Sequence, residues 1–136
     1  MKINHFEEIQ AWQEARKLAK EIYNFTKRLG FRKDFNLTSQ IQRAVISVMA
    51  NIAEGFDRQS KKEFVQYLYI ARGSLYETVT LLIIMHRNNW ITDEQLDSVK
   101  NFGDEIGKML SMLINTIKKK LIAMSYQLSA MSYYAL

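Results

Sequence analysis

Apolar side chains recur at intervals of three and four residues through most of the sequence, which is the spacing of amphipathic α-helices. Four helices are predicted: about Phe6 to Leu29, about Leu37 to Glu54, Ser60 to the region of His86, and Thr92 to about Met131. The connections between them are short, and short connections between long helices favour antiparallel neighbours. The pattern therefore predicts an all-α fold built as an antiparallel four-helix bundle.

Particular residues mark where the predicted helices begin and end. Gly30 and Gly55 are expected to end the first and second helices, because glycine accepts the left-handed conformation that follows many helices. Ser60 and Thr92 each precede a glutamate or glutamine by three residues, which is the spacing of a capping box. The third and fourth helices are therefore expected to begin at these two positions.

The chain of 136 residues suits one domain, residues 1–136. The bundle is expected to span about residues 5–120, and residues 121–136 form an extension expected to continue the last helix. The reason is that the apolar spacing resumes after Lys120 at Leu121, Met124, Leu128 and Met131. Proline and cysteine are both absent, which favours a helical domain and excludes disulfides and cysteine-based zinc sites.

The third predicted helix carries apolar residues on two sides. One side holds Phe64, Leu68, Ala71, Leu75 and Leu82. The second side is the predicted oligomer interface, and its members are Val65, Tyr69, Arg72, Tyr76 and Ile83. A bundle core covers only one side, so the second is expected to contact another copy of the chain. Gly73 is expected to allow close approach of another backbone, because glycine otherwise destabilises a helix interior.

The polar residues of the middle helices have two interpretations. They are either a solvated strip opposite the core or a polar network at a subunit contact. The candidate network comprises Arg43, Asn51, Glu54 and Glu77. In the second interpretation Arg43 or Arg72 pairs with Glu54 or Glu77, because an arginine in a partly desolvated position needs a carboxylate partner.

The net charge of +5 attracts the chain weakly to polyanions, and a basic surface on a soluble protein explains it equally well. The candidate nucleic-acid-binding residues are Arg16, Lys20, Lys27, Arg28, Lys118, Lys119 and Lys120. Arg16, Lys20 and Lys27 share one helix face and are spaced to follow a phosphate backbone. The three consecutive lysines either contact phosphates or only complement the negative end of the last helix.

No catalytic, metal-binding or cofactor-binding pattern stands out in the sequence. The two histidines, His5 and His86, do not follow a glutamate at the Glu-x-x-His spacing of di-iron bundles. The glycine-rich phosphate-binding motifs are also absent. We therefore expect no enzyme activity, no cofactor and no metal. Neither a signal peptide nor an apolar run long enough to span a bilayer is visible, so a cytoplasmic location without membrane contact is expected.

Several short segments together resemble one protein family. They are Phe6 and Trp12, residues 37–41 (LTSQI) with Arg43, residues 51–55 (NIAEG) with Arg58 and Ser60, and residues 71–77 (ARGSLYE). With these segments the chain resembles, over about Phe6 to Ile117, the four-helix-bundle proteins encoded in intervening sequences of bacterial large-subunit ribosomal RNA genes. The family commonly has a proline after the first helix and another inside the second, and this chain has neither.

The resemblance implies an up-down-up-down bundle that assembles as a ring-like homo-oligomer, with a pentamer suspected. It also implies kinship with accessory proteins of diversity-generating retroelements, which are basic pentamers that bind nucleic acid and a reverse transcriptase. The first functional hypothesis is a non-enzymatic homo-oligomer that binds RNA or DNA through basic faces. The alternative is a scaffold for a protein partner, such as an accessory subunit of a retroelement reverse transcriptase.

Overall fold

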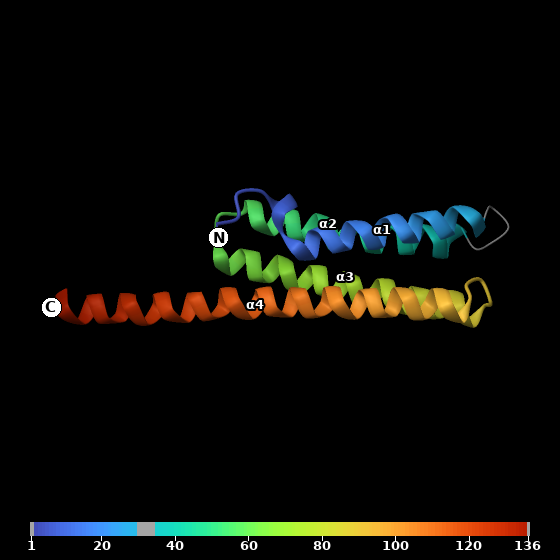
Figure 1. The fold of residues 1–136 in the computed structure, drawn as a ribbon. Helices are drawn as coiled ribbons and strands as arrows, with labels where there is room; N and C mark the ends of the chain where they lie inside the picture. Colours follow the sequence, from blue (N-terminus) through green and yellow to red (C-terminus); the bar gives the residue numbers. More distant parts are fainter. Residues whose placement is uncertain (1, 30–34, 136) are drawn as a thin grey trace.

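The computed structural model describes residues 2–29 and 35–135, and this part of the chain contains helices and no strand. A short 3-10 helix, η1, covers Phe6–Glu8. Four α-helices follow: α1 at Gln10–Leu29, α2 at Phe35–Asp57, α3 at Lys61–Arg87 and α4 at Asp93–Ala135 (Figure 1). The predicted all-α class with four helices is confirmed.

The four helices lie side by side along a common direction (Figure 1). The last residues of α1, the first residues of α2 and the turn between α3 and α4 lie at one end of the molecule. The N-terminal segment and the turn between α2 and α3 lie at the other end. Both α1 and α3 pack mainly against α2 and α4. It follows that α1 and α3 occupy diagonal positions, with their outer surfaces on opposite sides of the bundle.

The core is formed by the apolar stripes that the spacing predicts. Its largest fully buried side chains come from all four α-helices and include Leu18, Ile22, Ile41, Ile52, Leu68, Leu75, Leu82, Met85, Ile106, Leu110 and Ile114. Truncation of such a residue to alanine typically costs about 2–5 kcal/mol of stability. Trp12 and Tyr23 of α1 are only partly buried at the margin of this core.

The first predicted helix, Phe6 to Leu29, is interrupted near its start. Glu8 accepts hydrogen bonds from the backbone N–H groups of His5 (2.8 Å) and Asn4 (2.7 Å), which closes the short turn η1. These two bonds hold the pKa of Glu8 below its ordinary value. Ile9 then adopts an extended conformation and α1 begins at Gln10. The predicted helix end at Gly30 lies outside the described residues.

The second helix does not end at Gly55. α2 continues to Asp57, so the prediction of a glycine stop is wrong. Gly55 is buried inside the helix, and a Cβ atom added there would lie 2.5 Å from the Cβ of Tyr67 on α3. Glycine is present because two helices approach closely at this point, and its backbone freedom is not used.

The predicted starts of the third and fourth helices are confirmed. The Ser60 side chain accepts a hydrogen bond from the Glu63 N–H (3.3 Å), which caps α3. At α4 both bonds of a capping box form: the Thr92 N–H donates to Gln95 Oε1 (2.8 Å), and the Gln95 N–H donates to Thr92 Oγ1 (3.1 Å). Each cap satisfies backbone donors that would otherwise lack partners at a helix start.

α4 is much longer than its neighbours and projects beyond the ends of the other three helices (Figure 1). The helix runs through Lys118–Lys120 and continues past Met131, the predicted end, to Ala135. Residues 122–134 are all exposed. Nothing in the described chain therefore packs against most of the extension.

In the described part of the chain, α3 is the one helix long and apolar enough, by length and composition alone, to cross a membrane. Core helices of bundles meet the same criterion. α3 packs against α2 and α4, and its buried residues are Val65, Leu68, Ala71, Leu75, Thr78, Leu81, Leu82 and Met85. Burial in this core explains the apolar residues on one side of α3.

Candidate assembly and nucleic-acid interfaces

The surface of α3 that faces away from the bundle is unusually apolar. We call it the outer face of α3, and its members are Tyr69, Ile70, Gly73, Tyr76, Ile83 and Ile84. All six residues are exposed, with Ile70 at 53% and Tyr76 at 58% of their full accessibility. The exposed Thr80 and Glu77 lie among these residues on the same side of the helix. An exposed apolar patch of this kind is typical of an interaction site.

The structure places the five predicted interface residues differently from one another. Tyr69, Tyr76 and Ile83 are seven residues apart and all exposed, as an interface requires. Val65 is 7% exposed and belongs to the core, so its assignment to the interface is wrong. Val65 lies two helical turns before the half-buried Arg72, so both residues are on the same side of α3. That side is turned toward the bundle interior, unlike the side that holds Tyr69 and Tyr76.

Sequence reasoning missed two members of the outer face of α3, Ile70 and Ile84. Both lie one position from a member of the predicted stripe and fourteen residues from each other, so they share a helix face. A signal was present, because both isoleucines lie on the side of the helix opposite the predicted core residues Leu68, Leu75 and Leu82. Ile46 of α2 is similarly exposed, at 43%.

Arg72 is half-buried and is held by an aromatic ring and a hydroxyl group. Its guanidinium lies 5.0 Å from the centroid of the Tyr69 ring and donates to Ser111 Oγ of α4 (3.1 Å). Lys118 approaches the same ring, with its amine 5.2 Å from the centroid and donating to the Tyr69 hydroxyl (2.7 Å). Two cations thus contact Tyr69. The expected carboxylate partner of Arg72 was wrong, because cation–π contact and a hydroxyl acceptor satisfy the guanidinium instead.

The polar residues between α2 and α3 form a bridge without charges. The Asn51 amide donates to the carbonyl oxygen (2.8 Å) and the hydroxyl (3.0 Å) of Ser47. The hydroxyl groups of Ser47 and Ser74 are 2.9 Å apart and share a hydrogen bond. These hydrogen bonds link Asn51 and Ser47 of α2 to Ser74 of α3, and all three residues are half-buried.

The ion pair that Glu54 forms differs from the predicted one with Arg43 or Arg72. Glu54 pairs with Arg58 (2.8 Å), and the Tyr67 hydroxyl also donates to the Glu54 carboxylate (3.3 Å). The hydrogen bond from Arg58 to Glu54 raises the pKa of Arg58 above its ordinary value. Glu54 therefore does not pair with Arg43 or Arg72, because Arg58 lies one helical turn away and reaches it at little entropic cost.

Arg43 and Glu77 line one cleft between α2 and α3, of about 480 Å³, together with Gln40, Ala44 and Ser47. Both charged side chains are exposed, and within residues 2–29 and 35–135 they form no ion pair with each other. Arg43 donates instead to Ser39 Oγ (3.3 Å). A cation and an anion thus stand near each other at the edge of the outer face of α3.

The four predicted nucleic-acid-binding residues of α1 are all exposed: Arg16, Lys20, Lys27 and Arg28. We call Arg16, Lys20 and Lys27 the basic face of α1, because their spacing places them on one side of the helix. The two glutamates of α1 do not neutralise it. Glu14 pairs with Lys17 (2.9 Å), and Glu21 is half-buried and accepts a bond from Ser98 (3.4 Å).

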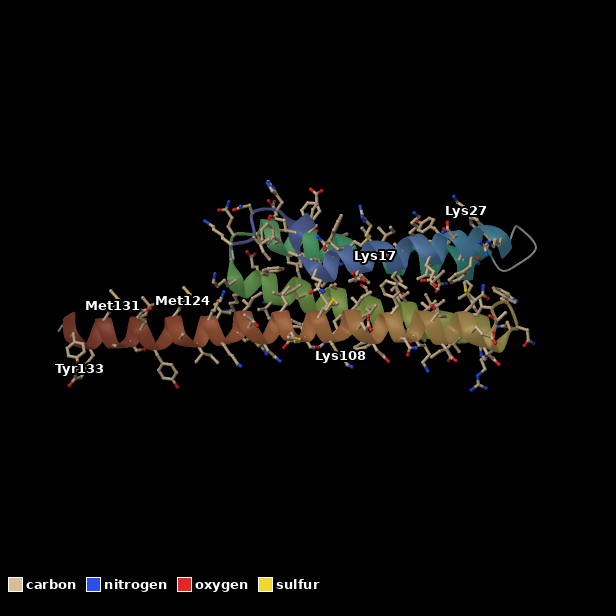
Figure 2. The ribbon with its side chains drawn as sticks, in the orientation of Figure 1. Lys17, Lys27, Lys108, Met124, Met131 and Tyr133 are labelled. Carbon is tan, nitrogen blue, oxygen red and sulfur yellow. The ribbon has the colours of Figure 1, made fainter. Side chains whose placement is uncertain are left out.

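Lys118, Lys119 and Lys120 are exposed but lie far from the end of α1. Lys120 lies next to Ser60 and Lys61, where α2 turns into α3, whereas Lys27 lies at the opposite end of the bundle (Figure 2). The structure therefore does not bring the two predicted basic sets together into one surface. Lys120 also lines a cleft of about 380 Å³ at the bundle end, together with Lys2 and Lys61.

No group of three His, Cys, Asp or Glu residues that would hold a metal ion occurs in the part of the chain that the structure describes. His86 contacts a carboxylate at a helix junction: its Nε2 lies 2.6 Å from Asp93 Oδ1, which ties the end of α3 to the start of α4. This contact has a clear structural role.

Fold and surface together define a class of small four-helix all-α protein with an exposed apolar helix face and a separate basic one. The family model described as 23S rRNA-intervening sequence protein matches residues 7–112, and the chain belongs to this family. The matched region ends before the extension of α4.

Solved structures are similar to this chain over the bundle. One of them comes from Bacteroides thetaiotaomicron VPI-5482 and is described as a protein with unknown function from the S23 ribosomal protein family. It is 34% identical in sequence with a TM-score of 0.73, and the match covers 77% of this chain and 95% of that one. No curated protein matches the sequence significantly.

Proposed function

We propose that the protein is a non-enzymatic homo-oligomer of up-down-up-down bundles, arranged as a ring, that binds RNA or DNA through the basic face of α1. One observation carries this proposal. The apolar outer face of α3 and the basic face of α1 belong to diagonal helices and point to opposite sides of the bundle. Assembly through α3 therefore leaves α1 free to contact a polyanion.

The residue types on the outer face of α3 suit a subunit contact. Tyrosine and arginine are enriched among the residues that dominate interface energies. Tyr69 and Tyr76 belong to this face, and the half-buried Arg72 lies beside it against the Tyr69 ring. Gly73 has no atom of the described chain within 4 Å of an added Cβ, so it leaves room for another subunit. The adjacent Arg43 and Glu77 offer unpaired charges of both signs to a neighbour. A ring of five is the number that the family resemblance implies.

The basic face of α1 suits a phosphate backbone. Arg16, Lys20 and Lys27 extend over twelve residues, or about 16 Å along the helix axis, which is enough to contact several phosphates. Such contacts carry no sequence information, so binding is expected to be similar for different sequences.

Replacing Tyr76 with lysine is expected to break the ring while helicity stays high. Tyr76 is 58% exposed within one chain, so its loss removes no core packing, but a lysine there would have to be buried unpaired in the interface. We expect the assembly to fall to at most two chains by light scattering, with unchanged circular dichroism. Tyr126→Lys, at a tyrosine 74% exposed on the extension, is the matched control. A ring of unchanged mass in the Tyr76 variant would remove the outer face of α3 as the interface.

Binding to nucleic acid is expected to weaken steeply with added salt. Neutralisation of about three phosphates on a single strand predicts a slope of about −2 in a plot of log affinity against log salt concentration. Fluorescence anisotropy with single-stranded RNA and duplex DNA of unrelated sequences measures this slope. Absence of binding to both, even at low salt, would reject nucleic-acid recognition and leave the assembly part of the proposal standing.

A second candidate function is a scaffold for a different protein, such as a reverse transcriptase of a retroelement. The cleft holding Arg43 and Glu77 beside the outer face of α3 favours it, since unpaired charges next to an apolar patch also suit a heterologous partner. Purification from the native cell after nuclease treatment separates the candidates. A stoichiometric second protein on the outer face of α3 supports the scaffold, and a pure homo-oligomer supports the ring.

A further inference from the structure

The extension of α4 continues the packing stripe of the core beyond the end of the bundle. Leu110, Ile114 and Ile117 are buried in the core. The same alternation of three and four residues then runs on through Leu121, Met124, Leu128 and Met131, which we call the extension stripe. A repeat with an average period of 3.5 residues is the pattern of helices that pack along their length in coiled coils.

Most of the extension stripe has no partner among the residues that the structure describes. Leu121 is half-buried at the bundle end, but Met124, Leu128 and Met131 are 47%, 62% and 64% exposed. Met124 and Met131 lie on the side of α4 on which the other three helices lie, and Tyr133 lies on the opposite side (Figure 2). A helix packed on the extension stripe would therefore lie in line with the bundle, directly beyond its end.

The charges around the extension indicate what that helix is. Residues 121–135 include no charged side chain, whereas Lys118, Lys119 and Lys120 immediately precede them. Lys120, which flanks Leu121, lies next to the bundle, and within residues 121–135 the flanking positions are Ser125, Gln127, Ser132 and Tyr134, none of them charged. Charges at such flanking positions usually select or reject a coiled-coil partner. Because none is present, two identical extensions meet no repulsion along their contact. A membrane-surface helix would instead carry basic residues on its polar face.

We propose that the extension pairs with the extension of a second copy of this chain as an antiparallel two-helix coiled coil. A parallel pair would bring two triple-lysine clusters together at the same end. An antiparallel pair separates the clusters by more than the length of the extension, roughly 30 Å, which exceeds the screening distance at physiological salt. It also uses the free space beyond each bundle, where nothing in the described chain covers residues 122–134.

The end of the bundle sets the register of this pair. Ala135 of the second helix has to lie beyond Leu121, because Leu121 is already half-buried against the core. With the stripes facing each other, Leu128 of one copy then lies opposite Met131 of the other, and the reverse. This contact is separate from the outer face of α3 and does not depend on the proposed ring.

The first test compares two glutamates on opposite sides of the same helix. Leu128→Glu places charge in the extension stripe and is expected to halve the mass of the assembly measured by light scattering. Tyr126→Glu is the matched control, because Tyr126 is 74% exposed and lies off the stripe, so the mass is expected to stay the same. An unchanged mass for Leu128→Glu, or equal loss in both variants, would overturn the pairing.

The same two variants in a Tyr76→Lys background separate this inference from the proposed ring. The pairing predicts a dimer for Tyr76→Lys alone and a monomer when Leu128→Glu is added. A monomer for Tyr76→Lys alone overturns the pairing even where the ring is real. Sedimentation with anionic phospholipid vesicles tests whether the extension stripe binds a membrane surface instead. If Leu128→Glu abolishes lipid binding without changing the mass of the assembly, the stripe belongs to a membrane contact and the pairing is rejected.

The second test uses the absence of cysteine in the chain to determine orientation. Leu128→Cys and Met131→Cys chains are prepared singly and also mixed in denaturant and refolded together, and all three samples are mildly oxidised. The antiparallel register predicts disulfide-linked dimers at least about tenfold more abundant in the mixture than in either single sample, since disulfides require close Cβ atoms. Efficient linkage in both single samples would show a parallel pair, and no linkage in any sample would contradict the contact.

Discussion

Reversal of the charge of Arg16, Lys20 and Lys27 to glutamate is expected to weaken binding to RNA and DNA by about 100-fold or more at low salt, because three phosphate contacts become repulsions. All three side chains are exposed, so the substitutions remove no core packing. The loss is expected to be uniform across sequences, since phosphate contacts do not read bases. Fluorescence anisotropy over a range of salt concentrations measures both the affinity and the slope, which should approach zero.

A control with the same change in net charge distinguishes a specific face from general attraction. Lys62 and Arg87 lie at the two ends of α3, and Lys100 lies on α4. All three are also exposed and are changed to glutamate together. This variant is expected to lose much less affinity, with light scattering to verify that its assembly is intact. Equal losses in both variants would show that net charge alone attracts the nucleic acid and that α1 has no special role.

Replacing Gly55 with alanine is expected to lower the free energy of unfolding by about 2–3 kcal/mol, because overpacking at a tight helix contact forces the backbone to shift. The added Cβ would lie 2.5 Å from the Cβ of Tyr67 and 3.0 Å from Cδ1 of Phe64. The first of these neighbours is attached directly to the backbone of α3, so no rotamer change relieves the clash. Chemical denaturation followed by circular dichroism measures the change.

The same substitution at Gly73 is expected to have the opposite sign. An added Cβ there meets no atom within 4 Å, and alanine is favoured over glycine in a helix by about 1 kcal/mol. Both variants are best compared in the Tyr76→Lys background, where the ring does not contribute to stability. If Gly55→Ala were as stable as Gly73→Ala, the close approach of α2 and α3 at Gly55 would be refuted.

The helices were predictable because their signals are local. The spacing of Leu68, Leu75 and Leu82 follows from the helical period and needs no knowledge of the neighbours that bury them. The starts at Ser60 and Thr92 were predictable for the same reason, since a cap joins residues only three positions apart. The interruption at Ile9 was missed. The hydrogen bonds from Asn4 and His5 to Glu8 join residues as close in sequence as those of a helix start, so the local pattern does not favour one over the other.

The candidate surfaces were only partly predictable. Exposure of Tyr69, Tyr76 and Ile83 followed from a second apolar stripe that one core does not cover. Val65 differed, because a rotation of a fraction of a turn decides whether a side chain at the edge of a stripe enters the core. The partners of the charged residues were the least predictable. Glu54 pairs with Arg58, and Arg72 contacts the Tyr69 ring, but helical periodicity does not indicate which of several nearby residues a charged side chain will contact.

By itself the sequence determined that the protein is helical, where most helices begin, which residues are apolar enough to enter a core and that the last helix runs past Lys120. These properties depend on bonds and periodicities within a few residues. Only the tertiary structure decided that Gly55 serves a helix contact, that the basic face of α1 and the apolar face of α3 lie on opposite sides, and that the extension stripe faces the space beyond the bundle. The physical reason is that each of these depends on how helices far apart in the sequence are rotated and placed against one another, and a helical period contains no information about that rotation.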